Sequence, residues 1–245
     1  MITSPHNERL KEIRKLNARR REREHAGRFV AEGEDLLAAA DAHGWTPLER
    51  FAAAGSGLPG IEVDAAVLAS AAELASGTRT LAVYEERWTP SPEGPLCVYL
   101  HGVRDPGNVG TVLRAAEAFG ASCAVLGPDC ADPYGPKAVR ASMGAIFAVP
   151  LVHAPPEQLP GIKIALDAHA ERSLAAVWNQ YAPTSATRFP PTFSLLIGAE
   201  RAGLPNEILQ AADETACIPI ATESLNAAMA ATIALYELTR MAPAR

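Results

Sequence analysis

The chain has 245 residues, of which 48% are hydrophobic, enough for one or two packed domains. Its formal net charge of −6 argues, as a sum, against a nucleic-acid partner. No segment approaches the ~20 continuous apolar residues of a membrane helix and no apolar run follows a charged start, so the composition excludes an integral membrane protein and predicts the cytoplasm.

Four cysteines are spread along the chain without any C-x-x-C pair, and three of them lie in apolar runs. They are Cys97, Cys123, Cys130 and Cys217. The histidines His101, His153 and His169 stand at no spacing that would complete a metal site with them. The cysteines are therefore predicted to be reduced core residues, and no metal is expected.

The basic charge is concentrated at the N-terminus. Residues 1–30 contain nine Lys or Arg and four Glu, a net charge of +5, while the remainder carries −11. Leu10, Ile13 and Leu16 recur at helical spacing, so an ordinary amphipathic helix with one solvated face is an equally good interpretation. The two interpretations are compatible, because the charged face stays free for nucleic-acid phosphates. The side chains predicted to bind them are Arg9, Lys11, Arg14, Lys15, Arg19, Arg20, Arg21 and Arg23.

The chain is predicted to divide into two domains. After the basic helix come a short apolar segment at 29–30, an Ala-rich helix at 34–42 and alternating apolar segments, which together predict a small α/β domain. Residues 88–95 include three prolines and a glycine, which disfavour regular structure and indicate a linker. The predicted domains are therefore 1–92 and 93–245.

In the second domain, apolar runs bounded by turns alternate with helical patterns. Strands are predicted at 96–100, 124–126, 162–166, 193–197 and 216–220, and helices at 109–119, 136–143 and 225–238. This alternation predicts an α/β fold with a mostly parallel sheet covered by helices. Ligands of such sheets bind in the loops at the carboxyl ends of the strands. Residues 181–191, rich in Pro and Ala, are expected to form an exposed loop.

The first of three clusters of glycine and polar residues, 101–110, joins a predicted strand to a helix. It lacks the G-x-G-x-x-G spacing of a dinucleotide-binding turn, so a nicotinamide-dependent enzyme of the doubly wound class is disfavoured. On the helix that follows, Arg114 lies off the apolar stripe. Considered alone, Arg114 is best explained as a surface charge paired with Glu117, three residues later.

The other two clusters follow later strands. At 197–205, Gly198 permits close backbone approach to a ligand and Glu200 is able to accept a hydrogen bond, although a plain turn with a solvated glutamate fits equally well. At 217–226, Ser224 or Asn226 is suited to cap the next helix, the commonest role of such residues there. The small residues of that helix admit close approach of another backbone or of a cofactor.

The three clusters together are more specific than each alone. The strings N-V-G-T-V-L-R-A-A-E-A-F-G, I-G-A-E-R-A-G-L and I-P-I-x3-S-L-N-A-A-M-A occur in this order, at 108–120, 197–204 and 218–230. They resemble the three signature motifs of the SpoU, or TrmH-like, family of SPOUT RNA methyltransferases. The segment 132–144 is similar to the family's connecting loop and helix, and residues 28–33 with the preceding basic helix resemble the substrate-binding domain that many members carry.

The resemblance implies a fold, an assembly and a cofactor. The C-terminal domain would be a SPOUT domain with a deep trefoil knot, the N-terminal domain would have a ribosomal-protein-like α/β fold, and the protein would be a homodimer. The cofactor would be S-adenosyl-L-methionine, held in the loops of the knot largely by backbone groups. The matching positions are Gly198, Ile218 and Leu225.

The resemblance also implies an activity, methyl transfer to a ribose 2′-hydroxyl of RNA. The family assigns activation of the hydroxyl to the arginine of the first motif, here Arg114, aided by Asn108, and Glu200, Ser224 and Asn226 match its remaining polar positions. Arg114 would act either as the base or, since arginine rarely gives up a proton, by stabilising the developing alkoxide.

Structured RNA is the expected partner, with ribosomal RNA preferred over transfer RNA because family members that carry the N-terminal domain often modify ribosomal RNA. The alternative is a non-catalytic RNA-binding or assembly protein that retains the fold. Binding of S-adenosyl-L-methionine would separate the two hypotheses.

Overall fold

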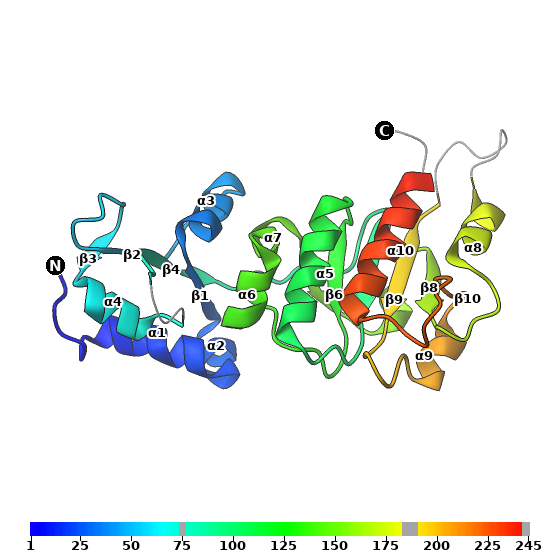
Figure 1. The fold of residues 1–245 in the computed structure, drawn as a ribbon, viewed down its shortest axis with the longest axis horizontal. Coiled ribbons are helices and arrows are strands. Elements are labelled where there is room, and N and C mark those ends of the chain that lie inside the picture. Colours follow the sequence, from blue (N-terminus) through cyan, green and yellow to red (C-terminus); the bar gives the residue numbers. More distant parts are fainter. Residues whose placement is uncertain (74–76, 183–190, 242–245) are drawn as a thin grey trace.

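The structure is a computed structural model that describes residues 1–73, 77–182 and 191–241. It is elongated, with a small sheet at the N-terminal end and a larger sheet in the C-terminal half (Figure 1). Within the described residues, none of the helices has the length and apolar character needed to cross a bilayer.

The N-terminal unit is a four-stranded sheet with helices packed on it. Its elements are α1 (Glu8–Ala18), α2 (Arg20–Ala26), β1 (Arg28–Glu32), α3 (Glu34–Ala42), β2 (Glu49–Ala53), β3 (Ile61–Val63), α4 (Ala65–Ala71) and β4 (Thr80–Glu85). The strand order is β1-β4-β2-β3, with β4 antiparallel to both of its neighbours and β2 parallel to β3. The predicted helix at 34–42 is confirmed, and the apolar face of the basic helix is buried through Leu10, Ile13 and Leu16.

The basic segment forms two helices, because Arg19 is extended (φ −138°, ψ 121°) between α1 and α2. A helix end leaves backbone carbonyls without partners. Here the guanidinium of Arg23 donates hydrogen bonds to the carbonyls of Leu16 and Asn17, in the last turn of α1. A side chain of α2 therefore supplies hydrogen-bond donors to the free carbonyls at the end of α1.

The C-terminal unit alternates strands and helices. Its elements are β5 (Leu96–Leu100), α5 (Pro106–Ala118), β6 (Cys123–Leu126), α6 (Pro136–Ser142), α7 (Ala145–Ala148), β7 (Leu151–His153), η1 (Pro156–Gln158), β8 (Ile162–Leu166), α8 (Leu174–Tyr181), β9 (Phe193–Ile197), α9 (Asn206–Ala211), β10 (Glu214–Ala216) and α10 (Ala227–Met241). The six strands are parallel in the order β10-β8-β9-β5-β6-β7. The predicted α/β fold with a helix-covered parallel sheet is confirmed.

The two faces of this sheet are covered differently. Side chains of α5, α7, α8 and α10 pack into the core on one face, and α5 and α10 lie in front of the strands in Figure 1. The other face is covered more thinly, by Leu159 just after η1 and by Leu204 and Ile208 at α9. All strands end at the same edge, so the loops that follow them meet there.

The predicted strand at 216–220 is wrong beyond its first residue. β10 ends at Ala216, which pairs with Leu166, the last residue of its neighbour β8. Cys217 makes only an isolated bridge with Ser173, after which the chain leaves the sheet, and Pro219 has no N–H to continue a ladder. The predicted loop at 181–191 lies largely outside the described residues, and Tyr181 belongs to α8.

The two units share one hydrophobic core. Phe29 of β1 packs on Tyr134 with ring centroids 4.6 Å apart, and Trp45 packs edge-on against Phe147 at 5.2 Å. The Trp45 indole also donates a hydrogen bond of 2.8 Å to the Phe147 carbonyl. The segment 86–95 between the units has no helix or strand, only an isolated bridge from Thr89 to Val152, and it contains the stretch 88–95 for which a linker was predicted. The Tyr134 hydroxyl is bonded to both the N–H and the carbonyl of Arg87 within it.

Candidate functional site

A cavity of about 120 Å³ lies at the carboxyl ends of β8, β9 and β10. Its walls come from the three loops that leave these strands and from the first turn of α10. Gly198, Ile218 and Leu225, the positions predicted to hold a cofactor, all line it. The remaining walls are mostly small or apolar side chains, with two carboxylates, Asp167 and Glu200.

Gly198 is required by the turn that forms one wall of this cavity. Ala199 and Gly203 close the turn with two backbone hydrogen bonds of 3.1 and 2.9 Å. A Cβ atom at position 198 would overlap the backbone of Gly203 and Leu204. Glycine therefore serves the close approach of two chain segments, which in turn shapes the cavity.

Three polar side chains from separate loops form a chain of hydrogen bonds beside this cavity. Asn226 caps α10, since its Oδ1 accepts from the N–H groups of Ala228 and Met229 at 3.0 and 3.2 Å. Its Nδ2 donates to Oδ1 of Asn108 at 3.0 Å, and Nδ2 of Asn108 donates to the Glu200 carboxylate. Asn226 thus has both the capping role and a place among the motif residues.

Asn108 reaches this position because of how α5 begins. Pro106 occupies the first turn, where its fixed φ suits a helix and its missing N–H costs nothing. The Asp105 side chain caps the helix by accepting from the N–H of Asn108 at 2.9 Å. The first turn of α5 is thereby fixed next to the loop that follows β9.

Two other predicted site residues lie outside that hydrogen-bonded chain. Ser224 lines the cavity but is exposed. Arg114 is exposed on α5 and makes no ion pair or hydrogen bond with any described residue. The surface pair with Glu117 is wrong, because Glu117 faces the His43 imidazole at 3.6 Å. Arg114 is consequently an exposed cation without a partner among the described residues, and it does not line the cavity.

Comparison with known proteins decides the family. Residues 95–236 match the model of the SpoU rRNA Methylase family. The chain belongs to the SpoU family. Residues 7–86 match the MRM3-like substrate binding domain. The predicted division at 92/93 falls between the two matched ranges and stays a prediction.

Solved and curated SpoU relatives extend this comparison. The crystal structure of an AdoMet-bound rRNA methyltransferase from Sinorhizobium meliloti is 30% identical, with a TM-score of 0.84 over 99% of this chain and 98% of that one. The 23S rRNA (guanosine(2553)-2′-O)-methyltransferase RlmP of Bacillus subtilis is 33% identical over 57% of this chain and 56% of the relative. The 23S rRNA (uridine(2479)-2′-O)-methyltransferase of Streptomyces viridochromogenes is 37% identical over 62% and 54%. The chain spans little more than half the length of these two curated relatives.

Most of the basic residues predicted to bind RNA already have partners in the SpoU protein. Ion pairs join Arg9 to Glu49, Lys11 to Glu8, Arg20 to Glu24 and Arg23 to Asp132. Arg14 donates to oxygens of Pro5 and Ser70. Arg23 is 5% exposed, which differs from the phosphate-binding position expected for it. Lys15, Arg19 and Arg21 remain exposed and unpaired among the described residues.

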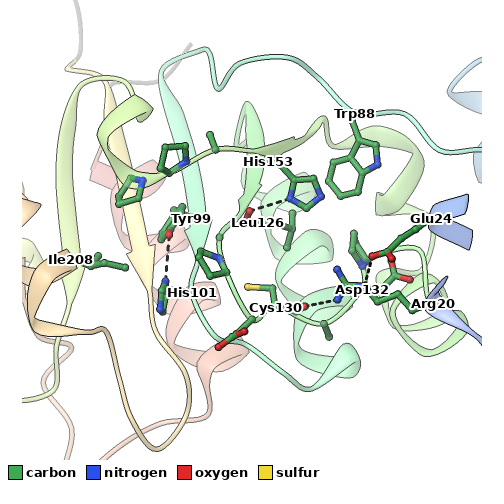
Figure 2. A pocket seen from close by; sticks show the side chains of 18 of the residues that line it. Arg20, Glu24, Trp88, Tyr99, His101, Leu126, Cys130, Asp132, His153 and Ile208 are labelled. Atoms are coloured by element: carbon green, nitrogen blue, oxygen red, sulfur yellow. Dashed lines mark hydrogen bonds and ion pairs between the residues drawn. The ribbon is translucent and has the colours of Figure 1, made fainter. Parts of the chain in front are cut away.

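A second, larger cavity was not predicted from the sequence. It is a groove of about 1050 Å³ between α2, the 86–88 segment and the carboxyl ends of β5, β6 and β7 (Figure 2). Trp88 stacks on His153 with ring centroids 3.9 Å apart, and the Tyr99 hydroxyl lies 3.4 Å from Nδ1 of His101. His101 and His153 each lie at the carboxyl end of a strand, and this position is the sequence feature from which the groove could have been predicted.

Burial perturbs several titratable groups of the groove. It raises the pKa of Glu86, whose carboxylate accepts a hydrogen bond of 3.2 Å from the Trp88 indole. It also raises the pKa of Tyr99 to about 12 and lowers the pKa of His101. Across the described residues, no group of three or more His, Cys, Asp or Glu side chains converges on a metal position.

Proposed function

We propose that this SpoU protein transfers a methyl group from S-adenosyl-L-methionine to a ribose 2′-hydroxyl of RNA. The observation that carries the proposal is the hydrogen-bonded chain Asn226–Asn108–Glu200 beside the cavity. It joins one residue from each of the three SpoU motifs in a single site. Two curated relatives named as 2′-O-methyltransferases and the AdoMet-bound solved relative support it.

The chemistry of the cavity fits this cofactor. Apolar walls at Ile218 and Leu225 suit the faces of an adenine ring, and the carboxylates of Asp167 and Glu200 suit hydroxyl groups and positive charge. When bound, the cofactor supplies an electrophilic methyl group on a sulfonium. The cavity of 120 Å³ is smaller than the roughly 300–1,000 Å³ of most small-molecule sites, so we propose that segment 218–226 moves outward on binding.

The residues of the chain then have separate tasks. A ribose hydroxyl is a poor nucleophile at neutral pH, and alignment with stabilisation of the developing alkoxide lowers the barrier. The hydroxyl proton passes to solvent water as the bond between the ribose oxygen and the methyl carbon forms. We assign the stabilisation to Arg114, whose guanidinium is free of carboxylate partners among the described residues. Asn108, held between Glu200 and Asn226, positions the reacting ribose, and Ser224 contacts the RNA from the cavity rim.

We also propose a homodimer, formed through α10 and the neighbouring face of α5. Met229 and Tyr236 of α10 are 56% and 50% exposed, and they lie on one face of the helix because they are seven residues apart. Phe119, at the end of α5, packs against the Tyr236 ring at 5.8 Å and extends the apolar surface. Sedimentation equilibrium should find a dimer, and Met229→Glu should shift it toward monomer. The trefoil knot implied by the family likewise stays a proposal for this chain.

Ribosomal RNA is the proposed substrate, and a methylation assay tests the whole assignment. Unmodified ribosomal and transfer RNA transcripts are incubated with the protein and methyl-labelled cofactor, and the labelled nucleoside is identified after digestion. We expect a 2′-O-methylated nucleoside from ribosomal RNA. Arg114→Ala should abolish it, while Arg79→Ala, which removes an exposed guanidinium paired with Glu34, should not.

Two outcomes would contradict this assignment in different ways. If calorimetry shows that the protein binds S-adenosyl-L-methionine but no RNA is labelled, the substrate class is wrong. If the cofactor does not bind at all, a non-catalytic RNA-binding or assembly protein is the better description.

A further inference from the structure

Among the described residues, the Lys and Arg side chains that are exposed and have no partner lie on a few elements only. Carboxylates hold most of the other Lys and Arg side chains, and Arg87 lies over the Trp45 ring at 4.0 Å. The free cations of the N-terminal unit are Lys15, Arg19 and Arg21 on α1 and α2. Among the described residues of the C-terminal unit, the free cations are Lys137 and Arg140 on α6, Arg114 on α5, and Arg201 after β9.

The elements that carry these cations adjoin one another. In Figure 1, α2, α6 and α5 follow in succession from the N-terminal end toward the centre of the molecule. A cavity of about 280 Å³ is lined by Asn17 at the end of α1, Pro106 at the start of α5 and Lys137 at the start of α6. Its two carboxylates are those of Glu73 and of Asp132, which is paired with Arg23. Lys137 therefore lies where the basic helices meet the helix that carries Asn108 and Arg114.

Helix α6 is held rigidly in this position. A Cβ atom at Gly110 would overlap the Ala138 carbonyl, so α6 packs directly against the backbone of α5. On its other side, Asp132 in the loop before α6 pairs with the buried Arg23 of α2 at 2.7 Å. Lys137 and Arg140 are three residues apart and lie on neighbouring positions of one helix face. The backbone positions that carry these two charges are thus fixed relative to α1, α2 and α5.

We propose that the RNA backbone crosses α6, with phosphates bound by Lys137 and Arg140, on its way from the basic helices to Arg114. This inference rests on the proposed function. Cations that have no carboxylate partner contribute most to binding when the ligand is a polyanion such as RNA. The large groove offers a less favourable route for phosphates, because Glu86, Glu157 and Glu207 line it.

The test compares variants that remove the same kind of charge in different places. Arg140→Ala and the double variant Lys137→Ala/Arg140→Ala are compared with Arg79→Ala, at the far side of the N-terminal unit. Binding of unmodified ribosomal RNA transcripts is measured from 50 to 300 mM salt, and methylation is measured at varied RNA concentration. Each lost phosphate contact should lower the slope of log K against log salt by about 0.7–0.9.

For the double variant we expect a slope lower by roughly 1.5 and a KM for RNA about tenfold higher, with unchanged kcat and cofactor affinity. Arg79→Ala should behave like the wild type. Slope and KM equal to those of Arg79→Ala would overturn the proposal. A change of oligomeric state in the double variant would also overturn it, because the face would then be an interface between copies. If the wild type binds RNA without methylating it, the proposed function is contradicted. The salt slopes of the variants would still show whether the RNA crosses α6.

Discussion

Replacing Arg23 by alanine distinguishes a structural role from an RNA-binding one. The Arg23 guanidinium contacts Asp132 through both Nε and Nη2, at 2.8 and 2.7 Å, and also donates to the carbonyls of Leu16 and Asn17. The side chains of Arg23 and Asp132 are only 7% and 13% exposed. Alanine would leave a nearly buried carboxylate without its cation and the end of α1 without its donors.

Breaking such a pair from one side costs about 3–5 kcal/mol, because the remaining charge stays buried. For a protein of this size that corresponds to a fall in Tm of roughly 6–20 °C. Arg21→Ala is the matched control, since Arg21 lies two residues away, exposed and unpaired among the described residues. Its free energy of unfolding should stay within about 0.5 kcal/mol of the wild type, while its RNA affinity falls.

Urea unfolding followed by tryptophan fluorescence is a suitable assay, because Trp45 and Trp88 both lie where the two units meet. The double variant Arg23→Met/Asp132→Leu, which removes both charges, should recover much of the loss. The reasoning is refuted if Arg23→Ala unfolds like the wild type and instead loses RNA affinity as Arg21→Ala does. Arg23 would then contact phosphate in the manner first expected from the sequence.

Three further changes test the site and its surroundings. Gly198→Ala should lower the free energy of unfolding by about 1–3 kcal/mol through overpacking, and calorimetry should detect no cofactor binding. Gly203→Ala is the matched control, because a Cβ atom there has free space. It should lower the free energy of unfolding only by the strain of a left-handed residue (φ +64°), about 1–2 kcal/mol. Asn226→Ala should lower the free energy of unfolding by about 1 kcal/mol through the lost helix cap, and should also reduce kcat. Asn226→Asp should keep the stability of the wild type but still reduce kcat. Equal kcat values for both variants and the wild type would contradict the role of Asn226 in positioning Asn108. The pKa of Asp213 is lowered, first by the backbone N–H of Lys163, so its stabilisation is present above the ordinary aspartate pKa and is lost as the pH falls through the lowered value. Asp213→Asn should therefore be less stable than the wild type at pH 7, and the difference should shrink as the pH falls through the lowered pKa; a difference that stays constant down the acid range would refute this.

The parts of the fold that local pattern determines were predictable. The strands at 96–100, 162–166 and 193–197 are confirmed residue for residue, because each is a short apolar run between turn signals. The α5 helix extends from 106 to 118 against a prediction of 109–119, since Pro106 and Asp105 set its start. The end of β10 was not predictable, because it depends on where the neighbouring strand β8 stops.

The candidate site was only partly predictable for the same reason. The motifs named Asn108, Glu200 and Asn226, but their hydrogen bonds span about a hundred residues and are known only from the folded chain. The charges of the basic segment look alike in sequence, although Arg23 is buried and Arg21 is exposed. What separates these two arginines is Asp132, a partner 109 residues away.

The shared core between the two units has a consequence for how such a protein can change over evolution. Tyr134 and Phe147 of the C-terminal half are covered by Phe29 and Trp45 of the other half. A gene that lost or exchanged its first ninety codons would expose these aromatic rings on the C-terminal half. Such a chain would need polar replacements at both positions to remain monodisperse. In chains that keep both halves, substitutions on one side of the junction are therefore expected to be tracked by substitutions on the other.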